Sequence, residues 1–453
     1  MADAQFASRR RLLHMLGVGM GSAFVWPQLA SAQASNYRAL VCVLLEGGND
    51  GENTLIRHDS AGYQQYAAVR TPASGINIAQ GALLPIQPSS LGTPFGFNPG
   101  CGAMQALFNQ KKLAVIANVG VLRSPATRAG LLTGGDPRPS QLFSHADQVR
   151  EIQTGDANDV LQTGWGGRIA DRLSTFNAGN SFPPLTTLGG ARVFIEGNAT
   201  IPLALPTNDF FAIMPSGNTQ VDGLRNAALQ QMLVEPRTNF YEQAAHLLAD
   251  QSLQSSTVVN PILSNQNTPV TTLFNGQNSD IGRQLRQVAR LIEARANIGL
   301  KRQVFFVRHS GYDTHTSQLG SHQGLLGSLS DALKSFSDSM VLLGLDQVVT
   351  TFTLSDFGRT FKPATGAGTD HGWGNYAFVM GGAVKGGDFY GRVPTAVLGG
   401  PDDLGDDGRW IPTTSIDQYA ATLARWFGIA DGDLPYILPN LDAFPTVNLG
   451  FMA

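Results

Sequence analysis

The sequence predicts an α/β protein whose sheet is mainly parallel and flanked by helices. Continuous apolar runs of strand length recur along the chain, and amphipathic helical patterns separate them. A strand that is buried on both faces has a continuous apolar run rather than an alternating pattern. Strands that alternate with helices usually form a parallel sheet. Polar residues follow several runs directly, at the edge where open α/β sheets assemble their sites.

Five segments carry the predicted strands. The first is the apolar run at 39–45, "ALVCVLL", which glycines and acidic residues follow. The same pattern recurs at 112–120, 303–315 and 347–358. Residues 375–384, "NYAFVMGGAV", form the fifth predicted strand.

The predicted helices lie between and after these strands. Short helical patterns occupy 100–110 and 145–155. Two long amphipathic patterns at 280–299 and 323–344 have apolar residues at helical spacing. The pattern at 415–429 begins at a Ser or Asp cap and predicts a helix that packs on the core.

The mature chain, residues 35–453, is interpreted as one α/β domain with a variable insertion around 185–280 that forms a cap or lid. The chain has 453 residues and a hydrophobic content of 42%, which is enough for one large core. Residues 251–280 are rich in Gln, Asn, Ser and Thr and are predicted to be a surface excursion, a mobile lid or a disordered segment. A net charge of −3 is not basic enough to indicate a nucleic-acid partner.

Residues 1–34 are predicted to be a twin-arginine export signal. A basic segment precedes an apolar stretch at about 15–26, and small residues precede Ala32 and Ala34. The apolar stretch is too short for a stable membrane span. The arginines at 9–11 resemble a twin-arginine motif. We therefore expect the Tat translocon as a partner during export and a periplasmic or secreted location in a bacterium.

The chain has two cysteines, Cys42 and Cys101. Cys42 lies in an apolar run and is expected to be a buried thiol. The sequence does not decide whether Cys42 forms a disulfide bridge with Cys101, which an oxidising compartment would allow. Neither cysteine has the spacing of a metal ligand.

Four clusters of acidic and histidine residues follow apolar runs or glycine turns, in "EGGNDGENT", "GYDTHT", "SDFGRT" and "TDHGWGN". Each has an ordinary interpretation as a turn, a helix cap or a loop histidine. Because three clusters come directly off predicted parallel strands, we expect their side chains to meet at one edge of the sheet. Carboxylate oxygen and imidazole nitrogen together suit Zn²⁺ or Mn²⁺, with Ca²⁺ or Mg²⁺ as further options. The candidate residues are Asp50, Asp313, His315, Asp356, Arg359, Asp370 and His371.

These motifs, together with "LFSHADQ", resemble the Tat-exported bacterial family known as domain-of-unknown-function family 1501, in the alkaline phosphatase and sulfatase superfamily. The resemblance runs from about residue 38 to about 430 and is thin at 185–280. It implies a doubly wound, alkaline phosphatase-like fold with a metal site for one or two divalent ions.

The resemblance also implies individual metal ligands. Asp50 matches the ligand at the end of the first strand. Asp313 and His315 match the pair that holds one ion, and Asp356 matches the aspartate that holds the other. His371, with Asp370 beside it as a further candidate, matches the late histidine.

One position departs from the pattern of the superfamily. The residue after Asp356, which is often histidine there, is Phe357 in this chain. Either His371 supplies the missing nitrogen or only one metal ion binds well.

Two serines are candidates for the nucleophile. Ser144 lies near a predicted helix N-terminus, where backbone N–H groups and the helix dipole favour anions. Its neighbour His145 is a candidate ligand or base, and Ser144 itself is alternatively a simple N-cap. The rival, Ser124, keeps the register of a sulfatase signature with Arg128, Thr133 and Gly134, although serine replaces the usual cysteine.

Two functions follow as hypotheses. The first is an exported metal-dependent hydrolase of a phosphate or sulfate ester, with a small molecule or glycan ester as its substrate. In this hypothesis Arg359 neutralises an anionic substrate oxygen or else pairs with a local carboxylate. The second is a secreted binding or surface-assembly protein that keeps the fold and the metal. The chain lacks the G-x-G-x-x-G and G-x-S-x-G motifs of dinucleotide-binding proteins and α/β-hydrolases.

Overall fold

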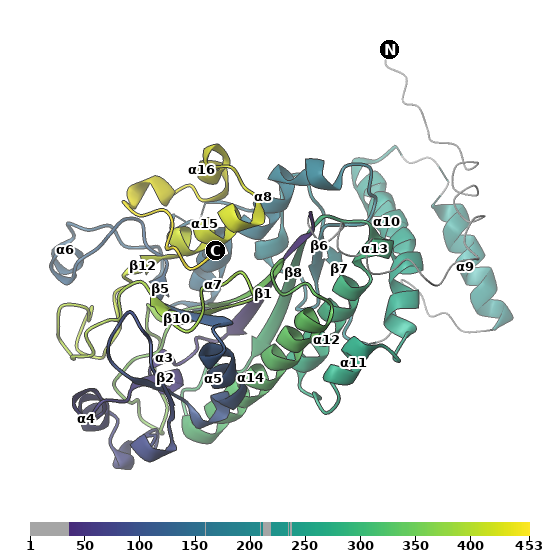
Figure 1. The fold of residues 1–453 in the computed structure, drawn as a ribbon. Coiled ribbons are helices and arrows are strands. Elements are labelled where there is room, and N and C mark those ends of the chain that lie inside the picture. Colours follow the sequence, from purple (N-terminus) through teal and green to yellow (C-terminus); the bar gives the residue numbers. More distant parts are fainter. Residues whose placement is uncertain (1–35, 159, 209, 212–218, 234, 236–237) are drawn as a thin grey trace. The chain divides into compact units, whose positions relative to one another are not determined.

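The computed structural model describes residues 36–453 apart from 159, 209, 212–218, 234 and 236–237 (Figure 1). The chain from Arg38 to Ala453 forms one structural unit. The predicted export signal at 1–34 lies outside the described residues. Among the described residues, no helix is long and apolar enough to cross a membrane.

A sheet of nine strands forms the centre of the described part of the chain, in the order β11-β5-β10-β9-β1-β8-β6-β7 with β12 beside β5. The parallel pairs are β1 with β8 and β9, β6 with β7 and β8, and β5 with β11 and β12. Only β10 runs antiparallel to its neighbours, β5 and β9. The bounds are β1 (Arg38–Glu46), β5 (Leu113–Gly120), β6 (Leu185–Thr187), β7 (Leu203–Ala204), β8 (Arg302–Ser310), β9 (Val349–Ser355), β10 (Asn375–Met380), β11 (Phe389–Tyr390) and β12 (Thr414–Ser415).

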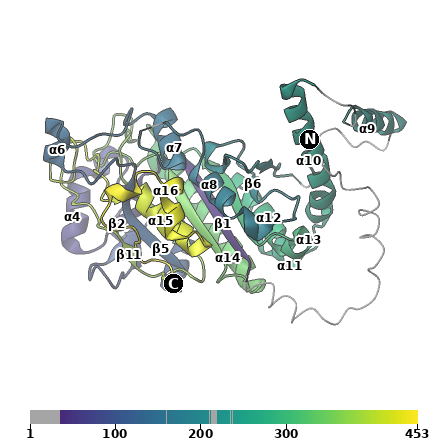
Figure 2. The same ribbon diagram turned by 90° about the horizontal axis from the view of Figure 1, so that it is seen from above.

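Helices cover both faces of this sheet, as expected for a doubly wound fold (Figures 1 and 2). On one face, α7 (His145–Thr154), α8 (Trp165–Arg172), α15 (Ile416–Phe427) and α16 (Leu434–Ile437) bury apolar side chains in a common core with the central strands. On the other face lie α5 (Gly102–Asn109), α12 (Asp280–Glu293) and α14 (Gln318–Leu342). The prediction of a mainly parallel sheet flanked by helices is confirmed.

The remaining elements lie outside this central sandwich. A small antiparallel sheet has the strand order β2-β4-β3. The bounds are β2 (Leu55–Arg57), β3 (Leu84–Ile86), β4 (Phe95–Phe97), α3 (Gly51–Thr54), α4 (Ser60–Val69), α6 (Arg128–Thr133), α9 (Gln220–Met232), α10 (Phe240–Ser264), α11 (Pro269–Leu273) and α13 (Arg295–Ile298).

The segment 251–280 was predicted to be a surface excursion, a mobile lid or a disordered segment. Much of it is helical, because α10 extends to Ser264 and α11 spans Pro269–Leu273. Three residues of α10, Ser255, Val259 and Leu263, are buried. They are four positions apart and therefore share one helix face. The high polarity of the segment concealed this narrow buried stripe.

Both cysteines are buried free thiols. Cys42 lies in the middle of β1, as predicted, and Cys101 precedes α5. The disulfide bridge that the sequence left open is therefore absent from the described structure.

The register of the three middle strands positions the candidate site. Glu46 of β1 is level with Ser310 of β8, and Leu45 is level with Ser355 of β9. Because the strands are parallel, their chains leave the sheet side by side at its carboxyl edge. The loops that follow these three strands carry the candidate residues Asp50, Asp313, His315, Asp356, Arg359, Asp370 and His371.

Candidate metal centre

The loop after β8 lies directly against the turn after β1. Gly47, the first residue of that turn, has a φ of 112°, which only glycine adopts readily. A Cβ atom at Gly47 would come within 2.4 Å of the backbone nitrogen of Asp313. Gly368 has a similar role, because a Cβ atom there would lie 2.1 Å from the carbonyl carbon of His315. Two glycines thus permit the close backbone approach that brings Asp313 and His315 to the sheet edge.

Three histidines from different parts of the chain converge on one carboxylate oxygen, Oδ1 of Asp313. The Nε2 atom of His315 lies 2.9 Å from this oxygen. The Nε2 atoms of His145, the first residue of α7, and of His371 lie 3.3 Å and 3.5 Å from it. In addition, the Nε2 atoms of His315 and His371 are 3.0 Å apart. We call these four residues the His₃Asp cluster.

Each imidazole of the cluster has an oxygen acceptor at its other nitrogen, Nδ1. A backbone carbonyl can only accept, so the imidazole that contacts one must carry its proton on Nδ1 and present an Nε2 lone pair. Carboxylate acceptors favour the same tautomer. Histidines that bind metal ions characteristically donate their second N–H to such an oxygen. The pairs are His145 with Asp356 Oδ2 (2.8 Å), His315 with Asp370 Oδ1 (3.2 Å) and His371 with the carbonyl oxygen of Phe143 (2.7 Å).

The charges of the cluster suit cation binding. Burial would raise the pKa of Asp313, but hydrogen bonding and the positive charge of Arg359 lower it, so this carboxylate is ionised. Burial lowers the pKa of His371 and favours its neutral form. The hydrogen bond to Asp356 raises the pKa of His145 and outweighs the effect of burial, so a cation that binds there must displace the proton from Nε2.

The spacing of the donor atoms fits a single small cation. His145, Asp313 and His371 offer one ligand atom each, and these atoms all lie within 4.8 Å of one another. Ligand atoms roughly 2.1 Å from a tetrahedral Zn²⁺ are about 3.4 Å apart. The separations of 2.9, 3.0, 3.3 and 3.5 Å within the cluster lie around this value. The residues present therefore fit a divalent metal ion.

Asp356 holds one imidazole of the cluster through a hydrogen bond. Its Oδ2 atom accepts the Gly47 N–H at 3.1 Å as well as the bond from His145. Its Oδ1 atom is buried and has no hydrogen-bond partner among the described residues. The structure thus places Asp356 as the residue that orients His145, with one donor atom still available.

Phe357, the residue after Asp356, packs against the cluster. Its ring centroid lies 4.7 Å from that of His145 and 4.8 Å from that of His371. The side chain is buried. Two imidazoles, His145 and His371, therefore occupy the region next to Phe357.

Arg359 is buried, and its guanidinium donates to groups of the protein itself. Its Nη1 atom donates to Asp313 Oδ1 at 2.8 Å and to the Gly47 carbonyl at 3.1 Å. Its Nε and Nη2 atoms donate to the side chain and the carbonyl of Thr369. Of the two interpretations of Arg359, the structure shows the pair with a local carboxylate and not a group that is free for a substrate oxygen.

Asp50 does not join the cluster, in contrast to the ligand role that the resemblance implies. It caps α3 by accepting from the backbone N–H groups of Glu52 and Asn53. Both of its oxygens also accept from the buried guanidinium of Arg70, at 2.8 Å and 3.0 Å, and Gln318 donates to Oδ2. Burial would raise the pKa of Asp50, but Arg70 holds it below its usual value. Its acceptor capacity is used within the protein.

The two candidate nucleophiles are placed differently. Ser144 is the N-cap residue of α7, directly before His145, and its hydroxyl donates to Asp147 in the first turn. Ser124 lies between β5 and α6, and the guanidinium of Arg128 donates to backbone carbonyls at Asp403 and Gly405. None of the hydrogen bonds described for the cluster involves the Ser124 segment.

Two features of the site were not identified from the sequence. Phe143, whose carbonyl holds His371, has a φ of 72°, which is unusual for a residue other than glycine. Arg70, the partner of Asp50, follows it by 20 positions without a motif around it. No local pattern in the sequence signals either contact.

Comparisons with known proteins were made on sequence and on structure. The family model described as "Protein of unknown function (DUF1501)" matches residues 37–403. No curated protein matches the chain.

Several solved structures are similar to this chain. PsFucS1 sulfatase from Pseudoalteromonas sp. shares 9% identity at a TM-score of 0.34, over 89% of this chain and 72% of that chain. The lipoteichoic acid synthase LtaP from Listeria monocytogenes shares 10% identity at a TM-score of 0.37, over 88% and 74%. The C-terminal periplasmic domain of EcEptC from Escherichia coli, in complex with Zn, shares 10% identity at a TM-score of 0.34, over 87% and 83%.

Proposed function

This chain belongs to the DUF1501 family, and on that premise we propose that it is an exported metal-dependent hydrolase of a phosphate or sulfate ester. One observation carries the proposal. Three imidazoles have their Nδ1 atoms held by oxygen acceptors and direct their Nε2 atoms at the same oxygen of Asp313. A divalent cation requires such convergence of ligand atoms, and histidines that bind metal ions donate their second N–H to an oxygen as these do.

The residues that would hold the cation are His145, Asp313 and His371, whose ligand atoms lie within 4.8 Å of one another. His315 lies beside them, with its Nε2 atom 2.9 Å from Asp313 Oδ1. A bound Zn²⁺ or Mn²⁺ ion acts as a Lewis acid that polarises an ester oxygen. Asp356 and Asp370 keep two of the imidazoles in the ligating tautomer, and Arg359 keeps Asp313 ionised and in place.

The N-terminus of α7 supports an anionic substrate. His145 is the first residue of this ten-residue helix and also belongs to the cluster. The first N–H groups of a helix have no partner within the helix, and together with the helix dipole they favour anions. We assign the role of nucleophile to Ser144, whose hydroxyl directly precedes His145 and already has an acceptor for its proton in Asp147.

The test combines metal analysis with turnover of 4-nitrophenyl phosphate and 4-nitrophenyl sulfate. We expect about one equivalent of divalent metal in the wild type, hydrolysis of one of the two esters, and loss of both properties in Asp313→Asn. Asp338→Asn is the matched control, because Asp338 pairs with Lys334 on the surface of α14. A wild-type protein that stays metal-free and inactive after incubation with Zn²⁺ and Mn²⁺ contradicts the proposal.

One observation favours the second candidate function, a secreted binding protein that keeps the metal. Arg359, which pairs with Asp313, is buried and is not free to neutralise a substrate oxygen. In that case metal raises the melting temperature, but no phosphate or sulfate ester in a broad panel is hydrolysed. A phosphorylated or sulfated Ser144 trapped during turnover excludes this alternative.

A further inference from the structure

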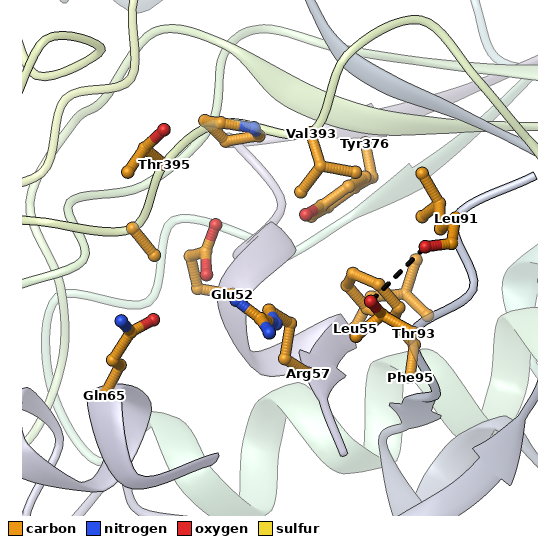
Figure 3. Close-up of a pocket in the computed structure, with 12 residues that line it drawn as sticks. Glu52, Leu55, Arg57, Gln65, Leu91, Thr93, Phe95, Tyr376, Val393 and Thr395 are labelled. Carbon is orange, nitrogen blue, oxygen red and sulfur yellow. Dashed lines mark hydrogen bonds between the residues drawn. The ribbon is translucent and has the colours of Figure 1, made fainter. Parts of the chain in front are cut away.

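A cavity of about 300 Å³ lies between the small sheet and the strand β10 (Figure 3). Its lining comes from α3, β2, α4, β4 and β10 and from the segments 91–93 and 393–396. It includes none of the four residues of the His₃Asp cluster. Much of the wall is apolar and includes Leu55, Phe95 and Val393. The cavity is therefore a separate site with its own chemistry, and we call it the Glu52 pocket.

Within the described part of the chain, one of the two carboxylate oxygens of Glu52 is free of protein partners and faces this cavity. Its Oε1 atom accepts the indole N–H of Trp410 at 2.9 Å. Its Oε2 atom has no hydrogen-bond partner among the described residues, and the carboxylate points toward the open space in Figure 3. Burial raises the pKa of Glu52 to about 7, although the positive charge of Arg70 and the hydrogen bond from Trp410 act in the opposite direction.

Other polar groups face the same space. The side chain of Tyr376 is largely buried, and its hydroxyl has no hydrogen-bond partner among the described residues. In Figure 3 this hydroxyl points toward the space that the Glu52 carboxylate also faces. Gln65 contributes an exposed amide at the rim. A carboxylate, a phenol and an amide together offer several acceptors to one incoming donor.

The positive charges near Glu52 are already paired. Arg57, a cation in the lining, donates to both oxygens of Asp59, at 3.0 Å and 3.1 Å. Arg70 is paired with Asp50 and acts on Glu52 only through its charge. Among the described residues, neither guanidinium forms a hydrogen bond with the carboxylate of Glu52.

We propose that the Glu52 pocket binds a small organic cation, a primary ammonium group carried on an apolar body. An ammonium group has three donors and no acceptor, which matches Glu52, Tyr376 and the amide oxygen of Gln65. The apolar body packs against the wall that Leu55 and Phe95 form. A metal ion fits less well, because the pocket offers a single carboxylate.

Calorimetric titration of the wild-type protein with benzylammonium at pH 8 tests the proposal, with benzyl alcohol and benzoate as neutral and anionic isosteres. We expect benzylammonium to bind at least about tenfold more tightly than either isostere. Glu52→Gln should remove this preference, and Tyr376→Phe should weaken binding several-fold. Benzyl alcohol or benzoate binding as tightly as benzylammonium overturns the proposal, as does no binding of any of the three.

A second pair of variants keeps the test valid if Glu52→Gln does not fold. Gln65→Lys adds a positive charge at the exposed rim and should weaken benzylammonium binding at least about threefold. Gln64→Lys is the matched control, because Gln64 is an exposed neighbour on α4 that does not line the pocket. Equal affinities for these two variants contradict the proposal. Asp313→Asn should bind benzylammonium like the wild type, so this outcome is independent of the metal centre.

Discussion

Substitution of Asp50 tests whether this aspartate, in the turn after β1, is a metal ligand or a structural residue. The substitution Asp50→Asn keeps a side-chain oxygen that can cap α3 but removes the charge that Arg70 contacts at 2.8 Å and 3.0 Å. Both side chains are fully buried. The remaining contacts of Arg70, to Asn53 and to the backbone carbonyls of Thr360 and Phe361, carry no charge.

Breaking one partner of a buried ion pair costs about 3–5 kcal/mol, because the other charge stays buried without compensation. We therefore expect Asp50→Asn to lower the free energy of unfolding of the metal-free protein by that amount. Removing the second charge as well, in Asp50→Asn/Arg70→Met, should restore part of the loss and give a positive coupling in a double-mutant cycle.

The assay is urea denaturation of metal-free protein, with metal content measured separately on the loaded protein. We expect Asp50→Asn to keep its metal equivalent, as the surface control Asp338→Asn does. A variant that loses the metal ion but unfolds at the same urea concentration as the wild type when metal-free refutes this reasoning, because Asp50 would then be a ligand.

Two further predictions concern other carboxylates. Asp356→Asn removes the charged acceptor for His145, and we expect metal affinity measured by competition with a chelator to fall about 10–100-fold, as for other residues that orient a ligand; unchanged affinity contradicts this role. Burial raises the pKa of Asp417 from 3.8 to about 7, so the folded state binds this proton more tightly than the unfolded state does. Stability should therefore fall as the pH rises from about 4 to 7, by at most about 4 kcal/mol, and Asp417→Asn should remove this slope. Urea denaturation at pH 5 and pH 8 measures this change in the free energy of unfolding. The same change in the variant and the wild type would contradict the raised pKa of Asp417.

The sequence carried much of the information about the sheet. Strands buried on both faces leave continuous apolar runs, and the five predicted segments correspond to β1, β5, β8, β9 and β10. Their direction was not readable throughout, because an antiparallel strand such as β10 is as apolar as its parallel neighbours. The helix α10 was missed because only one narrow stripe of a polar segment is buried.

Part of the candidate site was predictable, because the predicted strands also indicated which loops would meet at the sheet edge. Asp313, His315 and Asp356 follow parallel strands that end together, so the topology brings them together. His145 arrives from α7 and was recognised only through its motif. Asp50 was assigned as a ligand through the family resemblance alone, because an N-D-G turn looks the same in sequence whether the aspartate binds a cation or caps a helix. Only its contact with Arg70 separates the two cases.

The central claim is that one divalent cation lies among the Nε2 atoms of three histidines and a single aspartate oxygen. A crystal grown with Zn²⁺ and measured above and below the zinc absorption edge tests it most directly. We expect one strong anomalous peak about 2 Å from Asp313 Oδ1 and from the Nε2 atoms of at least His145 and His371. No peak at that position, or a peak at Asp50 instead, would contradict it.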